Sequence, residues 1–335
     1  MEKTSFIRNG STDLLRFIGL SLIILAHVAP PFVLFNLRCF DVPMMLFVSG
    51  LAYSGHKADF SPSFFVRRVL RLLVPVYLFL TAYFILVIIL RQAAGVDLGI
   101  RWKHVAESYL LLDGIGFVWI IRIFLLIGLL TPVLMTIERT VHSDAILLLM
   151  LTAVSAMMTA AIRHGFGLDN FFTRNYLYYA IGYSVPFIAG LRVGKMNPKR
   201  QAVFSLLVFL VLALSCSLYI MEGGSALNIN ALKYPPQTYF LFYGLFMSLV
   251  CHAVCCHSRL ARHIPALCRF IGMNTIWIYL YHIPAVHLTG ILPLPWWLRY
   301  VAVYAVSAAI TYAQIRIVAL LSSRHESTIY KYLRG

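Results

Sequence analysis

The chain has 335 residues, of which 61% are hydrophobic and only 12% charged, and its mean hydropathy is +0.82. Soluble, disordered and disulfide-stapled proteins of this length do not have so apolar a composition, so these classes are excluded. The net charge of +16 does not indicate a nucleic-acid partner, because the basic residues lie in short segments between apolar runs. The composition predicts an all-α integral membrane protein.

Apolar runs near 20 residues, the length that crosses a hydrocarbon layer about 30 Å thick, occur about ten times along the chain. The predicted transmembrane helices are 13–35, 41–55, 72–90, 115–136, 145–162, 176–194, 201–221, 236–257, 271–291 and 296–321. They leave no room for a soluble C-terminal domain. We therefore expect residues 1–335 to form a single membrane-embedded domain.

The lysines and arginines outside these spans fix the predicted orientation. On the side of the two termini we count 17 of them, against 8 on the opposite side. Because cytoplasmic loops of membrane proteins are enriched in Lys and Arg, both termini are predicted to be cytoplasmic. The first apolar stretch is not expected to be a cleaved signal peptide, because His27 would occupy a position where the cleavage site needs a small residue.

The first predicted span carries Asp13, Arg16 and His27. Eleven residues of α-helix make about 3.06 turns and rise about 16 Å, so Arg16 and His27 are predicted to share one face at different depths. A polar face at that depth is expected to line a polar cavity between helices that is reached from the cytoplasm. Pro30 and Pro31 then interrupt the helix. On these residues alone, a hydrogen-bonded imidazole with no chemical role fits His27 equally well.

A second basic group, Arg67, Arg68 and Arg71, precedes the third span. Arg68 and Arg71 are three residues apart and so lie on one helix face, where two guanidinium groups can bind a phosphate together. Arg67 is expected to point elsewhere. The alternative interpretation is an anchor that only fixes the orientation of the chain in the membrane.

One cluster has side chains that bind soft metals: Cys251, His252, Cys255, Cys256 and His257. The adjacent cysteines point to different sides of a helix, and cysteine is common in apolar interiors. We therefore expect no metal site.

Several motifs in order along the chain resemble the acyltransferase 3 family of bacterial membrane acyltransferases. They cover about residues 10 to 320. The motifs are Asp13-Leu14-Leu15-Arg16 followed by His27, Phe47-Val48-Ser49-Gly50, Arg68-x-x-Arg71, Trp119-x-x-Arg122 with Pro132, Tyr234-Pro235-Pro236, and Gly272-x-Asn274-Thr275-x-x-x-Tyr279-x-x-His282.

The resemblance implies an O-acyltransferase of the bacterial cytoplasmic (inner) membrane. It implies transfer of an acyl group, most often acetyl from acetyl-CoA, to a hydroxyl of a cell-surface polysaccharide, O-antigen or lipid-linked sugar. Acyl-CoA would act as a co-substrate, with no tightly bound cofactor. The expected partners are thus acyl-CoA, the glycan acceptor and membrane lipids, with no nucleic acid.

Site residues are assigned on the same basis. Acyl transfer needs a base for the acceptor hydroxyl, and imidazole is the side chain best suited to that task near neutral pH. The expected catalytic residues are His27, as general base or as a transiently acylated relay, with Arg16 and Asp13. The expected CoA-binding residues are Arg68, Arg71 and Arg67. The expected acceptor-binding residues are Arg122, Trp119, Ser49, Tyr279 and His282.

Two other functions remain open at this point. A transporter or flippase for a lipid-linked or anionic solute would use the same arginines to bind its cargo. The absence of carboxylates from the middle of the predicted spans argues against that function, because proton-coupled transporters usually have them there. An inactive membrane scaffold is the third possibility, and it predicts that replacing His27 changes no acylation.

Overall fold

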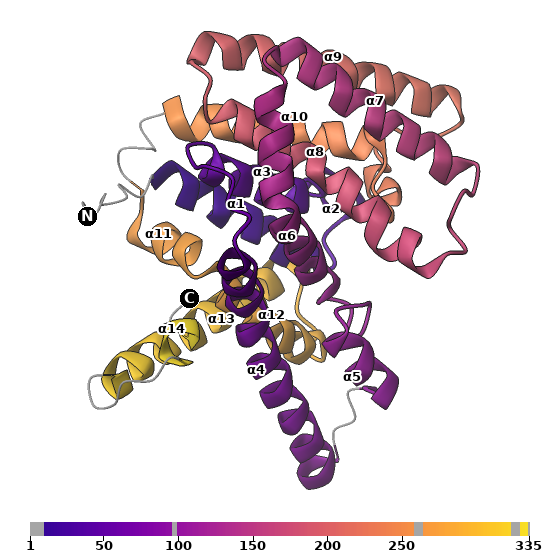
Figure 1. The fold of residues 1–335 in the computed structure, drawn as a ribbon. Helices are drawn as coiled ribbons and strands as arrows, with labels where there is room; N and C mark the ends of the chain where they lie inside the picture. Colours follow the sequence, from indigo (N-terminus) through magenta and orange to yellow (C-terminus); the bar gives the residue numbers. More distant parts are fainter. Residues whose placement is uncertain (1–9, 96–98, 258–263, 323–328, 334–335) are drawn as a thin grey trace, which may run out of the picture.

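The computed structural model describes residues 10–95, 99–257, 264–322 and 329–333, and these residues are helical with no strand among them (Figure 1). The helices are α1 (Gly10–Ala26), α2 (Phe32–Leu37), α3 (Asp41–Tyr53), α4 (Pro62–Ala94), α5 (Trp102–Tyr109), α6 (Trp119–Thr140), α7 (Asp144–Arg163), the π-helix η1 (Thr173–Leu177), α8 (Tyr178–Val193), α9 (Pro198–Met221), the 3-10 helix η2 (Ile229–Leu232), α10 (Thr238–His257), α11 (Ala266–Met273), α12 (Thr275–Gly290), α13 (Trp296–Ser322) and α14 (Ile329–Leu333). The all-α prediction is confirmed for the part of the chain that is described.

Seven segments within the described ranges are long and apolar enough to cross a membrane. They are Phe32–Tyr53, Pro62–Ala93, Trp119–Thr140, Asp144–Arg163, Pro198–Met221, Thr238–Cys256 and Trp296–Ser322. The other three predicted spans correspond to α1, α8 and α12, which are helices of 17, 16 and 16 residues. The count of ten spans and the cytoplasmic side of the termini therefore stay predictions. Part of the charge count, Lys3, Arg8, Arg259, Arg262, Arg324 and Arg334, lies outside the described residues.

The first predicted span, 13–35, is wrong at its C-terminal end. Helix α1 stops at Ala26, and the apolar residues from Phe32 onward belong to the next candidate span. The break contains Ala29, whose φ of 53° is left-handed, followed by the two prolines noted in the sequence. Neither a left-handed alanine nor a proline pair continues an α-helix, so the chain turns here.

Helices start where the local sequence satisfies their first N–H groups. The side chains of Ser61, Ser143 and Asn197 accept hydrogen bonds from backbone N–H groups three residues further on, at the starts of α4, α7 and α9. Proline occupies the first position of α4 and of α9, where its missing N–H costs nothing.

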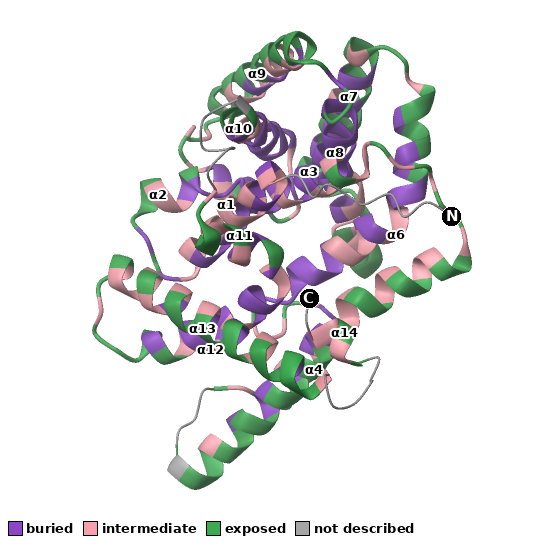
Figure 2. Cartoon of the chain, turned by 90° about the vertical axis from the view of Figure 1, so that its left-hand side faces the viewer, coloured by how far each residue is buried: buried purple, intermediate pink, exposed green. Residues whose placement is uncertain are grey.

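Helices α3 and α8 form the buried centre of the protein, whereas α9 and the outer part of α4 are largely exposed (Figure 2). The two central helices touch backbone to backbone. A Cβ added at Gly50 would lie 2.1 Å from the carbonyl oxygen of Phe187, and one added at Gly190 would lie 2.1 Å from that of Phe47. Small residues permit such close packing between membrane helices.

The remaining helices surround this pair. Helix α1 packs against α3 and α11, and α12 packs against α13. Helix α4 extends away from the other helices with α5 beside it, and the Tyr77 hydroxyl donates to the Tyr109 carbonyl across that contact at 3.0 Å (Figure 1). Arg192 of α8 pairs with Glu138 of α6 at 2.8 Å and with Asp144 of α7 at 3.2 Å, which fixes three helix ends together.

Candidate functional site

His27 lies directly after α1, in the break that separates this helix from α2. Its ring packs 4.5 Å from the ring centroid of Phe117 and 5.3 Å from that of His282. The residue is partly buried, so it is neither sealed inside the protein nor turned fully outward. The helix break therefore places this imidazole against side chains from α12 and from the segment before α6.

His282 is completely buried in α12. Its Nδ1 forms a hydrogen bond with the carbonyl oxygen of Tyr279, and a carbonyl only accepts, so Nδ1 carries the proton. Its Nε2 is buried without a hydrogen-bond partner. The Tyr279 hydroxyl donates to the carbonyl of Phe117, which connects α12 to the segment that covers His27. The ring of His287, also on α12, lies 5.7 Å from the Phe117 ring centroid. Three imidazoles and one phenol thus gather around Phe117.

Asp13 and Arg16 are at the other end of α1. Arg16 Nη1 lies 3.0 Å from Asp13 Oδ1, and the Arg16 side chain is 28% exposed. The rise of about 16 Å along the helix keeps this ion pair away from His27. The structure therefore brings Asp13 and Arg16 together with each other and separates them from the imidazole.

The three arginines at the start of α4 have different surroundings. Arg68 points inward: its guanidinium lies 4.9 Å from the ring centroid of Tyr53, and its side chain contacts Gly128 of α6. Arg71 is exposed, and Arg67 is exposed with its guanidinium 3.8 Å from an Asp59 carboxylate oxygen. Only Arg68 is part of the helix packing.

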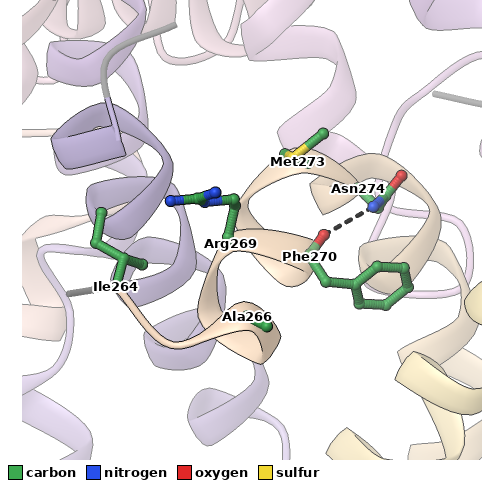
Figure 3. A pocket seen from close by; sticks show the side chains of 6 residues that line it. All are labelled: Ile264, Ala266, Arg269, Phe270, Met273 and Asn274. Atoms are coloured by element: carbon green, nitrogen blue, oxygen red, sulfur yellow. Dashed lines mark hydrogen bonds between the residues drawn. The ribbon is translucent and has the colours of Figure 1, made fainter.

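A hollow of about 340 Å³ lies beside α11 (Figure 3). Arg269 is the charged residue that lines it, and Asn274 at its rim donates to the Phe270 carbonyl at 2.7 Å. Helix α11 touches the start of α1 here, because a Cβ at Gly272 would lie 2.0 Å from the Asp13 carbonyl. The hollow is therefore at the same end of α1 as Asp13.

Trp119 and Arg122 are both buried in the first turn of α6. The Arg122 guanidinium lies 5.5 Å from the ring centroid of Tyr176 and 5.6 Å from that of Tyr179. Its Nε and Nη1 are buried and have no hydrogen-bond acceptor. The Trp119 ring meets the edge of Tyr234 at 5.0 Å. These two expected acceptor-binding residues thus belong to one aromatic group.

Ser49 is partly buried on α3, next to the close contact between α3 and α8, and it lies apart from this aromatic group. In the cysteine and histidine cluster of α10, Cys256 Sγ lies 3.4 Å from His252 Nε2. Over the described ranges, no three His, Cys, Asp or Glu residues are grouped so that they could hold a metal ion.

Sequence reasoning missed a buried ionic group. Asp41 Oδ2 lies 2.6 Å from Arg38 Nη1, and Asp41 Oδ1 lies 3.1 Å from Lys233 Nζ. All three residues are at most 3% exposed. Burial lowers the pKa of Lys233, and the adjacent Asp41 carboxylate raises it. The lysine also lies 5.5 Å from the ring centroid of Trp119, which joins the ionic group to the aromatic one.

Asp41 is the first residue of α3, as the predicted span 41–55 has it, and the turn 38–40 separates α3 from α2. The candidate span Phe32–Tyr53 joins the two helices, and Asp41 lies at their junction. The spacing of Arg38 and Asp41, three residues apart, was a usable signal for an ion pair. Lys233 is 192 residues away, and no local pattern connects it to Asp41.

The apolar helices and their buried polar groups define a multi-pass membrane protein. The sequence profile of the acyltransferase 3 family, described as an acyltransferase domain, matches residues 9–316. The chain therefore belongs to the acyltransferase 3 family and is a membrane acyltransferase, which confirms the resemblance seen in its motifs. Neither a search of the curated proteins nor a search of the solved structures found a match.

Proposed function

We propose that the protein transfers an acyl group, acetyl in the first instance, from acyl-CoA to a hydroxyl of a cell-surface polysaccharide, O-antigen or lipid-linked sugar. The observation that carries this proposal is the position of His27 in a family-defined acyltransferase: the imidazole lies in a helix break and packs against His282 inside the protein. Within a membrane, a helix break is tolerated where its backbone contacts protein or water rather than lipid. A reacting imidazole also needs such a position, because a substrate must reach it.

In the proposed reaction the acceptor hydroxyl oxygen forms a bond to the thioester carbonyl carbon while the carbon–sulfur bond breaks. His27 removes the hydroxyl proton, which then passes to the departing thiolate of CoA. General base catalysis of this kind contributes about 10²- to 10⁴-fold to a rate. A relay is the second route. A ring nitrogen of His27 bonds to the thioester carbonyl carbon, and CoA leaves as the thiol with the ring proton. The acceptor hydroxyl oxygen then takes the acyl group from the ring nitrogen, and the hydroxyl proton returns to the imidazole.

The donor is proposed to bind at the end of the protein where α1 and α4 begin. Arg68 and Arg71 supply positive charge there for CoA phosphates, with Arg67 further out on the exposed side. Arg16, held by Asp13, supplies a further cation at the start of α1. Guanidinium groups suit phosphate oxygens because they donate two parallel hydrogen bonds.

The test uses membranes that contain the full chain, supplied with radiolabelled acetyl-CoA and total glycolipid extract. The expected product is base-labile label on a glycan or lipid-linked sugar. His27→Ala is expected to lower the transfer rate at least about 100-fold while the protein remains inserted and monodisperse. The matched control is His56→Ala, a histidine in the turn after α3. Transfer that survives His27→Ala at the normal rate would refute the proposal.

Omitting the acceptor separates the two chemical routes. A relay leaves label on the protein that hydroxylamine removes and that is absent from His27→Ala. Direct transfer leaves no label on the protein, because the acyl group stays on CoA until the acceptor is present. Both results are read on the same gel.

A transporter or flippase is the alternative function, and one observation favours it. Asp41 and Arg38 lie in the candidate span Phe32–Tyr53 and form a buried ionic group with Lys233, which precedes the candidate span Thr238–Cys256. Ionisable residues in or beside membrane spans are common in transporters. Sealed vesicles that contain the purified protein and a fluorescent lipid-linked sugar would distinguish the two functions. Movement of the lipid without any acyl-CoA, and no acylation in its presence, would favour the transporter.

A further inference from the structure

Three cations and one carboxylate are buried in one group beside Trp119. Lys233 lies 5.5 Å from the Trp119 ring centroid, and Arg122 follows Trp119 by three residues on α6. Arg38 pairs with the same Asp41 carboxylate as Lys233. Each of the four charged residues is at most 3% exposed. Removing a charge from water costs free energy unless an opposite charge compensates it. The group therefore has a positive excess, and the exposed Asp113, which acts electrostatically on Arg122, is outside it.

The guanidinium groups of this cluster also have unused donors. Arg38 Nε, Arg122 Nε and Arg122 Nη1 are buried without an acceptor. A buried donor that lacks an acceptor is unfavourable, so most buried donors in folded proteins are satisfied. An anionic ligand with oxygen atoms would accept hydrogen bonds from these donors and would compensate the positive excess.

Aromatic rings surround these donors. Tyr176 and Tyr179 cover Arg122, while Trp119 lies between Tyr179, at 6.3 Å, and Tyr234, at 5.0 Å. Flat aromatic surfaces next to a few polar groups are typical of ligand sites, and they offer the apolar face on which a sugar ring packs.

Two features indicate where a ligand would reach the cluster. Tyr234 is 52% exposed, so its ring forms the outer side of the group. Tyr176 lies in the π-helical turn η1, and π-helical turns occur frequently at functional sites. The cluster also adjoins the proposed catalytic residue, because Phe117, whose ring lies 4.5 Å from that of His27, is two residues before Trp119.

We propose that Arg38, Arg122 and Lys233, with Trp119 and Tyr179, form an acceptor subsite for a sugar that carries an anionic group, either a phosphate or a carboxylate. This proposal rests on the proposed function and narrows its acceptor from glycans in general to anionic ones. The cations bind the anionic oxygens, and the aromatic rings hold the sugar beside His27. A neutral glycan would leave the positive excess of the cluster without a counter-charge.

The experiment measures binding without any acyl donor, so that it does not depend on catalysis. The full chain, as His27→Ala, is placed in nanodiscs of uncharged lipid, and the affinity of three probes is measured. The probes are farnesyl diphosphoryl-N-acetylglucosamine, a trisaccharide that contains glucuronic acid, and uncharged maltotriose. At least one anionic probe is expected to bind, and maltotriose is expected to bind at least about tenfold more weakly.

Arg122→Gln and Lys233→Met are each made in the His27→Ala chain. Each is expected to lower the affinity for the anionic probe about 10- to 100-fold, the range for the loss of one charge-assisted hydrogen bond. The matched control is Arg163→Gln, an arginine that pairs with the exposed Glu222. It is expected to leave the affinity unchanged. Binding of the diphosphate probe alone identifies a lipid-linked sugar as the source of the anion, and binding of the glucuronate alone identifies an acidic sugar.

Three results would overturn the proposal: equal binding of maltotriose, unchanged affinity in both Arg122→Gln and Lys233→Met, or displacement of the probes by vesicles of phosphatidylglycerol, which would assign the group to lipid headgroups.

Thermal unfolding gives a second readout. Arg122→Met removes buried unsatisfied donors, so its unfolding midpoint is expected to equal or exceed that of the parent chain. A large decrease would mean that Arg122 is structural. If the unsubstituted chain transfers no acyl group while the His27→Ala chain binds the anionic probe, the proposed function alone is refuted.

Discussion

Substitutions of Asp41 and of Lys233 in the buried ionic group are expected to lower stability by unequal amounts. Asp41→Asn leaves the Arg38 guanidinium and the Lys233 ammonium buried without a counter-charge, although both now lie within 3.1 Å of the Asp41 carboxylate. Removing one partner of a buried pair costs about 3–5 kcal/mol. Lys233→Met instead leaves a balanced Arg38–Asp41 pair and adds an apolar side chain, so we expect a loss within about 1 kcal/mol.

The assay is thermal unfolding of the purified protein in one detergent, followed by the loss of the monodisperse peak in size-exclusion chromatography. The loss of stability in Asp41→Asn corresponds to a fall in the unfolding midpoint of roughly 4–7 °C, whereas Lys233→Met is expected to shift it by about 2 °C or less. Glu222→Gln is the control, because it breaks an exposed ion pair with Arg163 that contributes at most about 1 kcal/mol. Equal destabilisation by Asp41→Asn and Lys233→Met would refute the reasoning.

Three further predictions concern the helices that support the site. Gly50→Ala places a Cβ 2.1 Å from the Phe187 carbonyl and is expected to lower stability by about 1–3 kcal/mol, whereas Gly55→Ala, with open space around it, changes the unfolding midpoint little. Ser61→Ala removes the N-cap of α4 and is expected to cost about 1 kcal/mol in the same assay. Ala29→Val puts a β-branched residue at φ 53° and is expected to lower the free energy of unfolding by about 1–3 kcal/mol. Ala29→Gly is expected to change that free energy by at most about 1 kcal/mol. A tolerated Gly50→Ala, Ser61→Ala or Ala29→Val would contradict the corresponding packing, cap or backbone argument.

The sequence predicts the helical class and the interruption after His27, because both depend on local properties. Apolar runs of span length identify membrane helices, and two successive prolines end a helix whatever surrounds them. The reliance on local hydropathy also explains why the predicted end of the first span is wrong. Hydropathy continues through the break to Leu37, so the apolar run alone does not reveal that α1 ends at Ala26.

The contacts between distant segments could not be predicted. Helical spacing places Arg68 and Arg71 on one face, but only the packing of α3 and α6 decides that Arg68 turns onto Tyr53 while Arg71 stays exposed. His282 illustrates the same limit, since its ring contact with His27 joins residues from opposite ends of the chain. Residue spacing predicts which side chains share a face of one helix, whereas these contacts depend on how different helices pack together.

Helix α6 adjoins both proposed binding sites. Arg122 is in its first turn, and Gly128, against which Arg68 packs, follows six residues later, a rise of about 9 Å. An acyl donor held by one site and an acceptor held by the other would thus lie less than two turns of one helix apart. Because a single helix holds both sites at a fixed separation, the protein would need no large rocking movement to complete a turnover.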